Sequence, residues 1–214
     1  TGPYTSYRSM RYHYDYLGNV IQTLYADGSH TATATYDALD RLTAMSDPDL
    51  GSWSVGYDAN GNQTQTVDPR GTEGTVYYGY DGLNRLQWQS NHSDGSSPYA
   101  SYTYDSTANG NDGIGHLTSE TFASGPSQSI TGSYAYGYDG RGRHTSWSMT
   151  INSTAYPFTF GYNDAGQQTS ITYPDGDLVT TSYSGQGWLA GATETLGSTT
   201  NTLLNSIGYT GEPG

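Results

Sequence analysis

The sequence predicts an all-β protein, in which tandem β-hairpins follow one another in a continuous antiparallel sheet that coils like the wall of a shell or a solenoid. Three observations predict this. A tyrosine motif returns nine times in 214 residues, aromatic and small residues alternate before it, and Asp, Asn and Gly cluster after it. We therefore expect a single array of about nine units over residues 1–214.

The motif tyrosines recur every 21 to 34 residues, and most of them precede an aspartate. In one-letter code the clearest units read YDYLGNV from Tyr14, YDALDRL from Tyr36, YDANGNQ from Tyr57, YDGLNRL from Tyr80 and YDGRGRH from Tyr138. Later units diverge, to YNDAGQQ from Tyr162 and YSGQGWL from Tyr183. The positions expected to build the repeat are Tyr14, Asp15, Tyr36, Asp37, Tyr57, Asp58, Gly61, Tyr80, Asp81, Tyr104, Asp105, Tyr138, Asp139, Tyr162, Tyr183 and Tyr209.

The first strand of each unit is predicted from alternation with a period of two. Such alternation places the aromatic residues on one face of a strand and Ser, Thr, Gly or Ala on the other. The runs are Trp53, Val55 and Tyr57; Tyr102 and Tyr104; Tyr134, Tyr136 and Tyr138; and Phe158, Phe160 and Tyr162. We expect these runs to end at the motif tyrosine.

Turns and second strands complete each hairpin. Asp, Asn and Gly after the tyrosine tolerate positive φ and form local hydrogen bonds, which favours a tight turn. Second strands are expected to begin at Leu42, Leu86, Leu117 and Leu189. Further turns are expected at Ala26-Asp27-Gly28, Asp47-Pro48-Asp49, Asp94-Gly95 and Pro174-Asp175-Gly176. After Tyr104, the polar insert STANGNDGI is expected to lengthen one loop between intact strands.

Composition raises a conflict that the aromatic residues resolve. Leu, Ile, Val and Phe number only 27 of 214, and the net charge is -13, which is typical of disordered chains. However, 22 Tyr and 4 Trp supply large amphipathic side chains instead. We expect a tyrosine ladder as the core, with Tyr36, Tyr57, Tyr80 and Tyr138 stacked along one face. The aspartate after each of them should accept N–H bonds in its turn.

The charge pattern limits the partners. The chain has no lysine, seven arginines and 20 acidic residues, so it repels phosphate backbones and anionic lipids. We therefore expect no nucleic acid partner. No run of 18 apolar residues or signal-peptide pattern occurs, so we expect no membrane insertion. Without cysteine there is no disulfide or thiolate site. The composition favours a protein that is secreted or on the cell surface.

The repeat resembles a known family. The pattern Y-D-x-x-G-[NR]-L, followed after a strand by a Pro-Asp-Gly-like turn, resembles the tyrosine-aspartate (YD) repeat of Rhs proteins, toxin-complex cocoon subunits and teneurins. The resemblance runs from about Arg11 to Tyr209. It implies hairpins in a spiral sheet, which closes into a hollow shell in long members. Residues 207–214 resemble the start of the family's repeat-associated core segment, but its autoproteolytic aspartates are not in this sequence.

Motifs for chemistry are sparse. The five histidines are far apart, and no G-x-S-x-G elbow or P-loop occurs, so we expect no catalytic residues, no cofactor and no metal. Asp58 to Asn62 and Asp105 to Asp112 offer oxygen ligands around glycine, as calcium loops do. The first of these segments is also the ordinary turn of the repeat and lacks a closing glutamate. We therefore favour a repeat turn over a calcium-binding loop at this segment.

The leading functional hypothesis is a non-catalytic scaffold, a segment of an extracellular Rhs-like wall that encloses or presents a cargo such as a toxin. It would pair through strand edges with flanking YD repeats of the same polypeptide. An alternative is a protomer that pairs with identical chains in an extracellular filament or surface layer, because no capping segment is seen at either end. A second alternative is a glycan-binding adhesin that uses Trp53, Trp88, Trp147 and Trp188 as stacking platforms.

Overall fold

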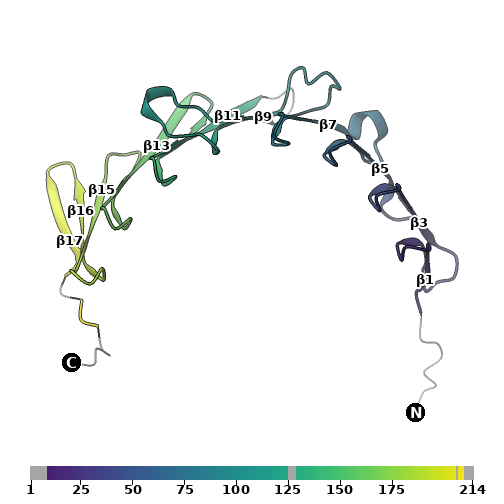
Figure 1. Cartoon of the computed structure of the whole chain (residues 1–214), viewed down its shortest axis with the longest axis horizontal. Coiled ribbons are helices and arrows are strands. Elements are labelled where there is room, and N and C mark those ends of the chain that lie inside the picture. The colour runs from purple at the N-terminus through teal and green to yellow at the C-terminus, as the bar shows by residue number, and fades with distance from the viewer. Residues whose placement is uncertain (1–8, 125–128, 206, 210–214) are drawn as a thin grey trace, which may run out of the picture. The chain divides into compact units, whose positions relative to one another are not determined.

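The computed structural model of the chain describes residues 9–124, 129–205 and 207–209. Contacts between residues divide the chain into two units, residues 1–98 and 99–214, and each is described by itself. In both units, antiparallel strands lie side by side in chain order and are joined by tight turns (Figure 1). The described helical residues form only two short 3-10 turns. The predicted all-β hairpin array is confirmed.

The first unit is a meander of eight strands, each of which pairs with the next. A 3-10 turn, η1 (Gly71–Gly74), lies between its sixth and seventh strands. The strands are β1 (Arg11–Tyr14), β2 (Val20–Leu24), β3 (Thr31–Tyr36), β4 (Leu42–Asp47), β5 (Gly51–Tyr57), β6 (Gln63–Val67), β7 (Thr75–Tyr80) and β8 (Leu86–Ser90). The motif tyrosines Tyr14, Tyr36, Tyr57 and Tyr80 each end a strand, as expected from the alternation.

The second unit is a meander of nine strands with the same successive pairing. The predicted insert after Tyr104 forms a loop that contains the 3-10 turn η2 (Ala108–Gly110). The strands are β9 (Ala100–Tyr104), β10 (Leu117–Ser124), β11 (Ile130–Tyr138), β12 (His144–Ile151), β13 (Thr154–Tyr162), β14 (Gln168–Thr172), β15 (Leu178–Tyr183), β16 (Leu189–Leu196) and β17 (Thr199–Leu204).

A one-residue β-bulge recurs at eight of the nine motif tyrosines. In β3 and β4, Thr35 lies opposite Ala44 and Tyr36 lies opposite Leu42, so Thr43 is the extra residue. A bulge strengthens the local right-handed twist of the strand pair. Each hairpin therefore adds a twist at the same point of its repeat.

The two faces of the sheet carry different side chains. In β4 and β5, Met45 lies opposite Trp53, while Ser46 lies opposite Ser52. Because cross-strand partners share a face and successive residues alternate between faces, this strand pair has one aromatic face and one face that carries hydroxyl groups. The motif tyrosines Tyr57 and Tyr138 lie on the aromatic face.

The expected tyrosine core differs from the observed one. Among the described residues, the buried apolar side chains are only Ala100, Tyr138 and Ala192, and most aromatic rings are half-buried. The physical reason is that contacts between elements join strands that are neighbours in one layer, so no second layer covers the aromatic face within a unit. The rings gain their burial from neighbours on the same face.

Candidate functional site

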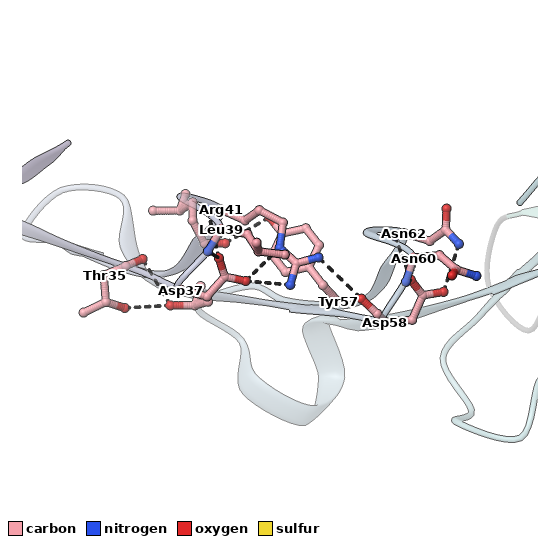
Figure 2. A network of polar contacts seen from close by, with 10 residues as sticks. Thr35, Asp37, Leu39, Arg41, Tyr57, Asp58, Asn60 and Asn62 are labelled. Atoms are coloured by element: carbon pink, nitrogen blue, oxygen red, sulfur yellow. Dashed lines mark hydrogen bonds and ion pairs between the residues drawn. The ribbon is translucent and has the colours of Figure 1, made fainter. Parts of the chain in front are cut away.

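The turn after each motif tyrosine is the most regular polar site in the chain, and Figure 2 shows two copies of it. In the copy at Asp37, the backbone N–H of Asp37 donates to the carbonyl of Arg41 at 3.0 Å, and the N–H of Asp40 donates to the carbonyl of Asp37 at 3.1 Å. The Asp37 carboxylate accepts the N–H groups of Leu39 at 2.9 Å and Arg41 at 3.1 Å. This aspartate therefore closes its own turn.

The same carboxylate contacts recur in the other YD turns. The Asp58 carboxylate accepts the N–H groups of Asn60 at 2.9 Å and Asn62 at 2.8 Å. Equivalent pairs of bonds are made by Asp15, Asp81 and Asp139. The expectation that these aspartates accept N–H bonds in their turns is confirmed. At the insert, Asp105 accepts the N–H of Gly115 at 2.6 Å and so closes the longer loop.

The residue four positions after the aspartate completes each turn with its side chain. Arg41 Nε donates to the second carboxylate oxygen of Asp37 at 2.7 Å, and Asn62 makes the same contact with Asp58 at 2.9 Å. Arg85 and Arg143 repeat the arginine version. Either an amide or a guanidinium satisfies the geometry because each offers an N–H at that point.

One position of the turn requires a left-handed backbone. Gly61 has a φ of +91°, and Gly18, Gly142, Gly166 and Gly187 at the equivalent position are also positive. Asp40 and Asn84 occupy this position in their turns with φ of 59° and 61°. Glycine adopts this conformation without the steric cost that a Cβ brings, while Asn and Asp tolerate it better than other residues.

The tyrosine hydroxyl joins one unit to the preceding unit. Tyr57 Oη donates to the main-chain carbonyl of Leu42, the first residue of β4, at 3.0 Å. Tyr36, Tyr80, Tyr138 and Tyr183 donate likewise to a carbonyl at the start of an earlier strand, and Tyr209 donates to the carbonyl of Leu189. This bond uses only main-chain acceptors, so it does not depend on the acceptor's side chain.

The rings of the motif tyrosines alternate with other side chains. The Arg41 guanidinium lies over the Tyr57 ring at 4.4 Å from its centroid, and Arg143 lies over Tyr162 at 4.5 Å. Within the described first unit, no ring contact joins Tyr36, Tyr57 and Tyr80, which differs from the expected ring-on-ring stacking. Motif tyrosines occupy every second strand and are thus about 10 Å apart, beyond the 4.5–7 Å range of ring contacts. The strand between them supplies the intervening group.

Electrostatics of the turns follow from these hydrogen bonds. The Arg143 side chain is the main cause that lowers the pKa of Asp139 to about 2, and the turn amides lower it further, while desolvation opposes them. The Arg41 side chain likewise lowers the pKa of Asp37. For Asp58, the side chain of Asn62 is the largest cause of its lowered pKa. These carboxylates are held in their ionised form as parts of the turn.

The remaining predicted positions are spread along the two units. Tyr14 is 57% exposed at the end of β1, and Tyr209 is 45% exposed with its ring edge on Trp188. In the described residues, no three His, Asp or Glu side chains gather as a metal site. Residues 210–214, which belong to the segment that resembles the repeat-associated core, lie outside the described residues.

The tryptophans of each unit make different contacts. The Trp88 ring covers Gly79 and Gly95, where an added Cβ would lie 2.1 and 2.7 Å from it. Trp147 lies between Tyr134 and Phe158 on the aromatic face of the second unit. Trp53 and Trp188 are 37% and 38% exposed.

Among the described residues, no helix is long and apolar enough to cross a bilayer.

Comparison with known proteins identifies the repeat. The Rhs repeat family model matches residues 14–52, 36–73 and 162–199. The comparison with curated proteins finds no match. Among solved structures, the chain is similar to the crystal structures of TcdB2-TccC3-Cdc42 and TcdB2-TccC3-TEV, with TM-scores of 0.67 and 0.66, both at 15% identity over 94% of this chain and 11% of the other. The Tc holotoxin pore of Photorhabdus luminescens matches with a TM-score of 0.60 at 14% identity over the same shares.

The chain thus spans about 11% of the length of the structures it matches. Three family matches coincide with the YD turns, and the structural neighbours share the fold of successive hairpins. The turns, bulges and tyrosine bonds described above recur in every part of the chain that the family model matches. Residues 14–73 and 162–199 of the chain are therefore identified as Rhs (YD) repeats.

Proposed function

We propose that this chain is a stretch of non-catalytic wall in a larger Rhs-type shell, which encloses or presents a cargo outside cells. Its partners are then the flanking YD repeats of the same polypeptide, which continue the sheet through strand edges. The toxin-complex context of the structural neighbours supports a cargo, and a toxin is the cargo class we propose.

One observation carries the proposal: six motif tyrosines, Tyr36, Tyr57, Tyr80, Tyr138, Tyr183 and Tyr209, each donate a hydrogen bond to a main-chain carbonyl of the preceding unit. Tyr57 to Leu42 at 3.0 Å and Tyr138 to Leu117 at 2.9 Å are the same connection in different units. Because the acceptor is main chain, any number of hairpins joins by the same rule. A hydrogen bond that recurs in this way joins successive hairpins into an extended sheet, as in other repeat architectures.

The use of the repeated polar groups supports a structural role over a catalytic one. The carboxylates of Asp37, Asp58 and Asp139 each accept two turn amides and a further side-chain donor. A general acid or base needs a proton that exchanges with substrate near the working pH. Carboxylates held ionised inside their turns do not meet that requirement.

The test is to sequence the gene that encodes this chain and to image its full product by electron microscopy. We expect an open reading frame much longer than 214 residues and closed, hollow particles. Extended filaments of identical short chains would contradict the shell and favour the surface-layer alternative. Disruption of one internal turn in the full product, for example by Asp58→Ala, should make the particles leak cargo, and an enclosed cargo that stays protected from protease in that variant would weigh against the wall.

A further inference from the structure

The first turn of the array, at Asp15, is built like the third turn, at Asp58. The Asp15 carboxylate accepts the backbone N–H groups two and four residues later, both at 2.9 Å, and Asp58 accepts the equivalent groups at 2.9 and 2.8 Å. Asn19 Nδ2 donates to the second oxygen of Asp15 at 3.0 Å, which repeats the bond from Asn62 to Asp58. The two turns therefore present the same main-chain and side-chain groups.

The third turn is completed by an arginine of the preceding hairpin. Arg41 lies over the Tyr57 ring at 4.4 Å from its centroid, and its Nη1 donates to the carbonyl of Asp58 at 3.4 Å (Figure 2). The Tyr57 hydroxyl donates to the carbonyl of Leu42, the residue after Arg41, at 3.0 Å. The contact thus has a donating half, which is Arg41 and the carbonyl that follows it, and a receiving half, which is Tyr57 and its turn.

In the second unit, the donating side chain occupies the same place, directly before the second strand of its hairpin. Arg143 lies over the Tyr162 ring at 4.5 Å and reaches the carbonyl of Asn163 at 3.3 Å. His116 stacks on the Tyr138 ring at 4.3 Å. These motif tyrosines are therefore covered by a planar nitrogen-bearing group from the hairpin before them.

Tyr14 has the receiving half of this contact without the donating half. It is 57% exposed, the largest value among the motif tyrosines that the structure describes, whereas Tyr57 is half-buried and Tyr138 is 8% exposed. In the described part of the chain, no ring or guanidinium contacts Tyr14 and its hydroxyl makes no hydrogen bond. Strand β1 pairs with β2, and no other strand of the first unit pairs with it. A strand edge of this kind is a template for a further strand.

Two kinds of boundary between hairpins alternate in the first unit. At one kind, an asparagine side chain donates to the next turn, from Asn19 to Asp40 at 3.1 Å and from Asn62 to Asn84 at 2.8 Å. The boundary between these two is the arginine kind, made by Arg41. Because the two kinds alternate, the boundary that precedes the first turn is expected to be of the arginine kind.

We propose that Tyr14, its turn and the outer edge of β1 form the receiving surface for a further hairpin, which lies upstream in the same polypeptide and carries an arginine directly before its second strand. The guanidinium lies over the Tyr14 ring, whose quadrupole attracts it, and donates to the carbonyl of Asp15. The Tyr14 hydroxyl donates to the carbonyl after the arginine. This inference rests on the wall proposed above, and it names the side chain that the neighbouring repeat presents.

The test joins such a hairpin to the array and measures whether it covers Tyr14. A copy of residues 31–53, which holds β3, Arg41 and β4, is placed directly before Arg11 instead of residues 1–10. The copied Arg41 then precedes Tyr14 by the same number of residues as native Arg41 precedes Tyr57. Nitration with tetranitromethane, located by mass spectrometry, reports the exposure of each ring. We expect Tyr14 to react several-fold more slowly in the extended chain than in the native chain.

Two other tyrosines are the controls. Tyr16 is 94% exposed and should keep its rate, so equal slowing of Tyr14 and Tyr16 would show a general effect and overturn the surface. Tyr57 keeps its own neighbours in both chains, so its native rate shows that the extended chain is folded.

A second extended chain guards against a copy that does not fold. It carries residues 130–158, with Arg143 as the donating side chain, before the same Arg11. Protection of Tyr14 in neither extended chain overturns the proposal. That failure leaves the wall function standing, because the length of the gene and the images of its full product test the wall independently.

The guanidinium is tested by Arg41→Asn in the copied hairpin. Asparagine closes the turn at this position, as Asn62 does, so the variant keeps the hairpin and removes only the guanidinium. Tyr14 should regain much of its reactivity, and Arg41→Asn in the native chain should expose Tyr57 in the same way. Full protection of Tyr14 by the asparagine copy would overturn the role of the arginine. Protection in the native chain that grows with protein concentration would assign the surface to a second copy and overturn the upstream hairpin.

Discussion

Tyr138 donates its hydroxyl to the main-chain carbonyl of Leu117 at 2.9 Å while its ring is only 8% exposed. Its ring stacks on His116 at 4.3 Å and contacts His144 at 4.6 Å. One side chain therefore supplies both the burial and the connection between successive units. For the other motif tyrosines that make this bond the acceptor is Val20, Leu42, Gln63, Gln168 or Leu189, which shows that the acceptor's own side chain is free to vary.

Substitutions at Tyr138 should separate burial from hydrogen bonding. We expect Tyr138→Phe to lower the free energy of unfolding by about 1 kcal/mol through the lost bond. Tyr138→Ala should cost about 3–5 kcal/mol, since it also removes the ring. Tyr156 is 41% exposed, so Tyr156→Phe is a control that should change stability little. Urea unfolding measures all three, and native stability in Tyr138→Ala would refute the role of the ring.

Acid should destabilise the protein through its turn aspartates. The folded pKa of Asp139 is about 2, chiefly because of the bond from Arg143, and that of Asp27 is about 2, chiefly because of the backbone N–H of His30. In the unfolded chain an aspartate titrates near about 3.9. Because the pKa of each carboxyl group is lower in the folded protein than in the unfolded chain, its ionised form stabilises the fold at pH values above the unfolded pKa. That stability is lost as the pH falls from about 4 to about 2.

The measurement is the urea midpoint between pH 7 and pH 2. The Asp139→Asn variant should already be less stable than the native chain at pH 7. Its free energy of unfolding should fall less on acidification, because the variant lacks one of the carboxyl groups whose pKa is lowered by folding. Identical pH profiles for the two proteins would contradict the assignment of Asp139.

Hairpins and turns were predictable because their signals are local. Alternation ends at Tyr57, and Asp58 to Asn62 then form the turn that their residue types favour. The bulge was not predictable, since the extra residue is Thr43 in one unit and Ala190 in another, and no residue type marks it. It arises from the register between two strands, which a single strand's sequence does not contain.

The alternation of tyrosine rings with arginine side chains does have a signal in the sequence. Arg41, Arg85 and Arg143 stand at the same position of the turn, four residues after the aspartate. Strand spacing places that residue between successive motif tyrosines.

Two glycines of neighbouring turns should respond differently to a methyl group. Gly61 has a φ of +91°, so we expect Gly61→Ala to cost about 1–2 kcal/mol from the left-handed backbone alone. Gly82 is outside the positive-φ set, and an added Cβ there meets nothing within 4 Å. Gly82→Ala should therefore be neutral or slightly stabilising, since it restricts the unfolded chain. Thermal melting compares the pair, and equal losses would contradict the backbone explanation.

Arg143 should not be replaceable by lysine. Its Nε donates to Asp139 at 2.7 Å, a terminal nitrogen reaches the carbonyl of Asn163 at 3.3 Å, and its plane lies over Tyr162. A lysine ammonium lacks the planar fork that makes these contacts together. We expect Arg143→Lys to lower the free energy of unfolding by about 1 kcal/mol.

Arg141 provides the comparison for that substitution. It is exposed, and its side chain donates to the carbonyl of Asp164 at 2.7 Å. A lysine at this position keeps both the charge and a donor, so Arg141→Lys should cost less than Arg143→Lys in urea unfolding. If both substitutions cost the same, the guanidinium between Asp139 and Tyr162 contributes no more than a surface charge, and the alternation of rings and cations is not what joins the units.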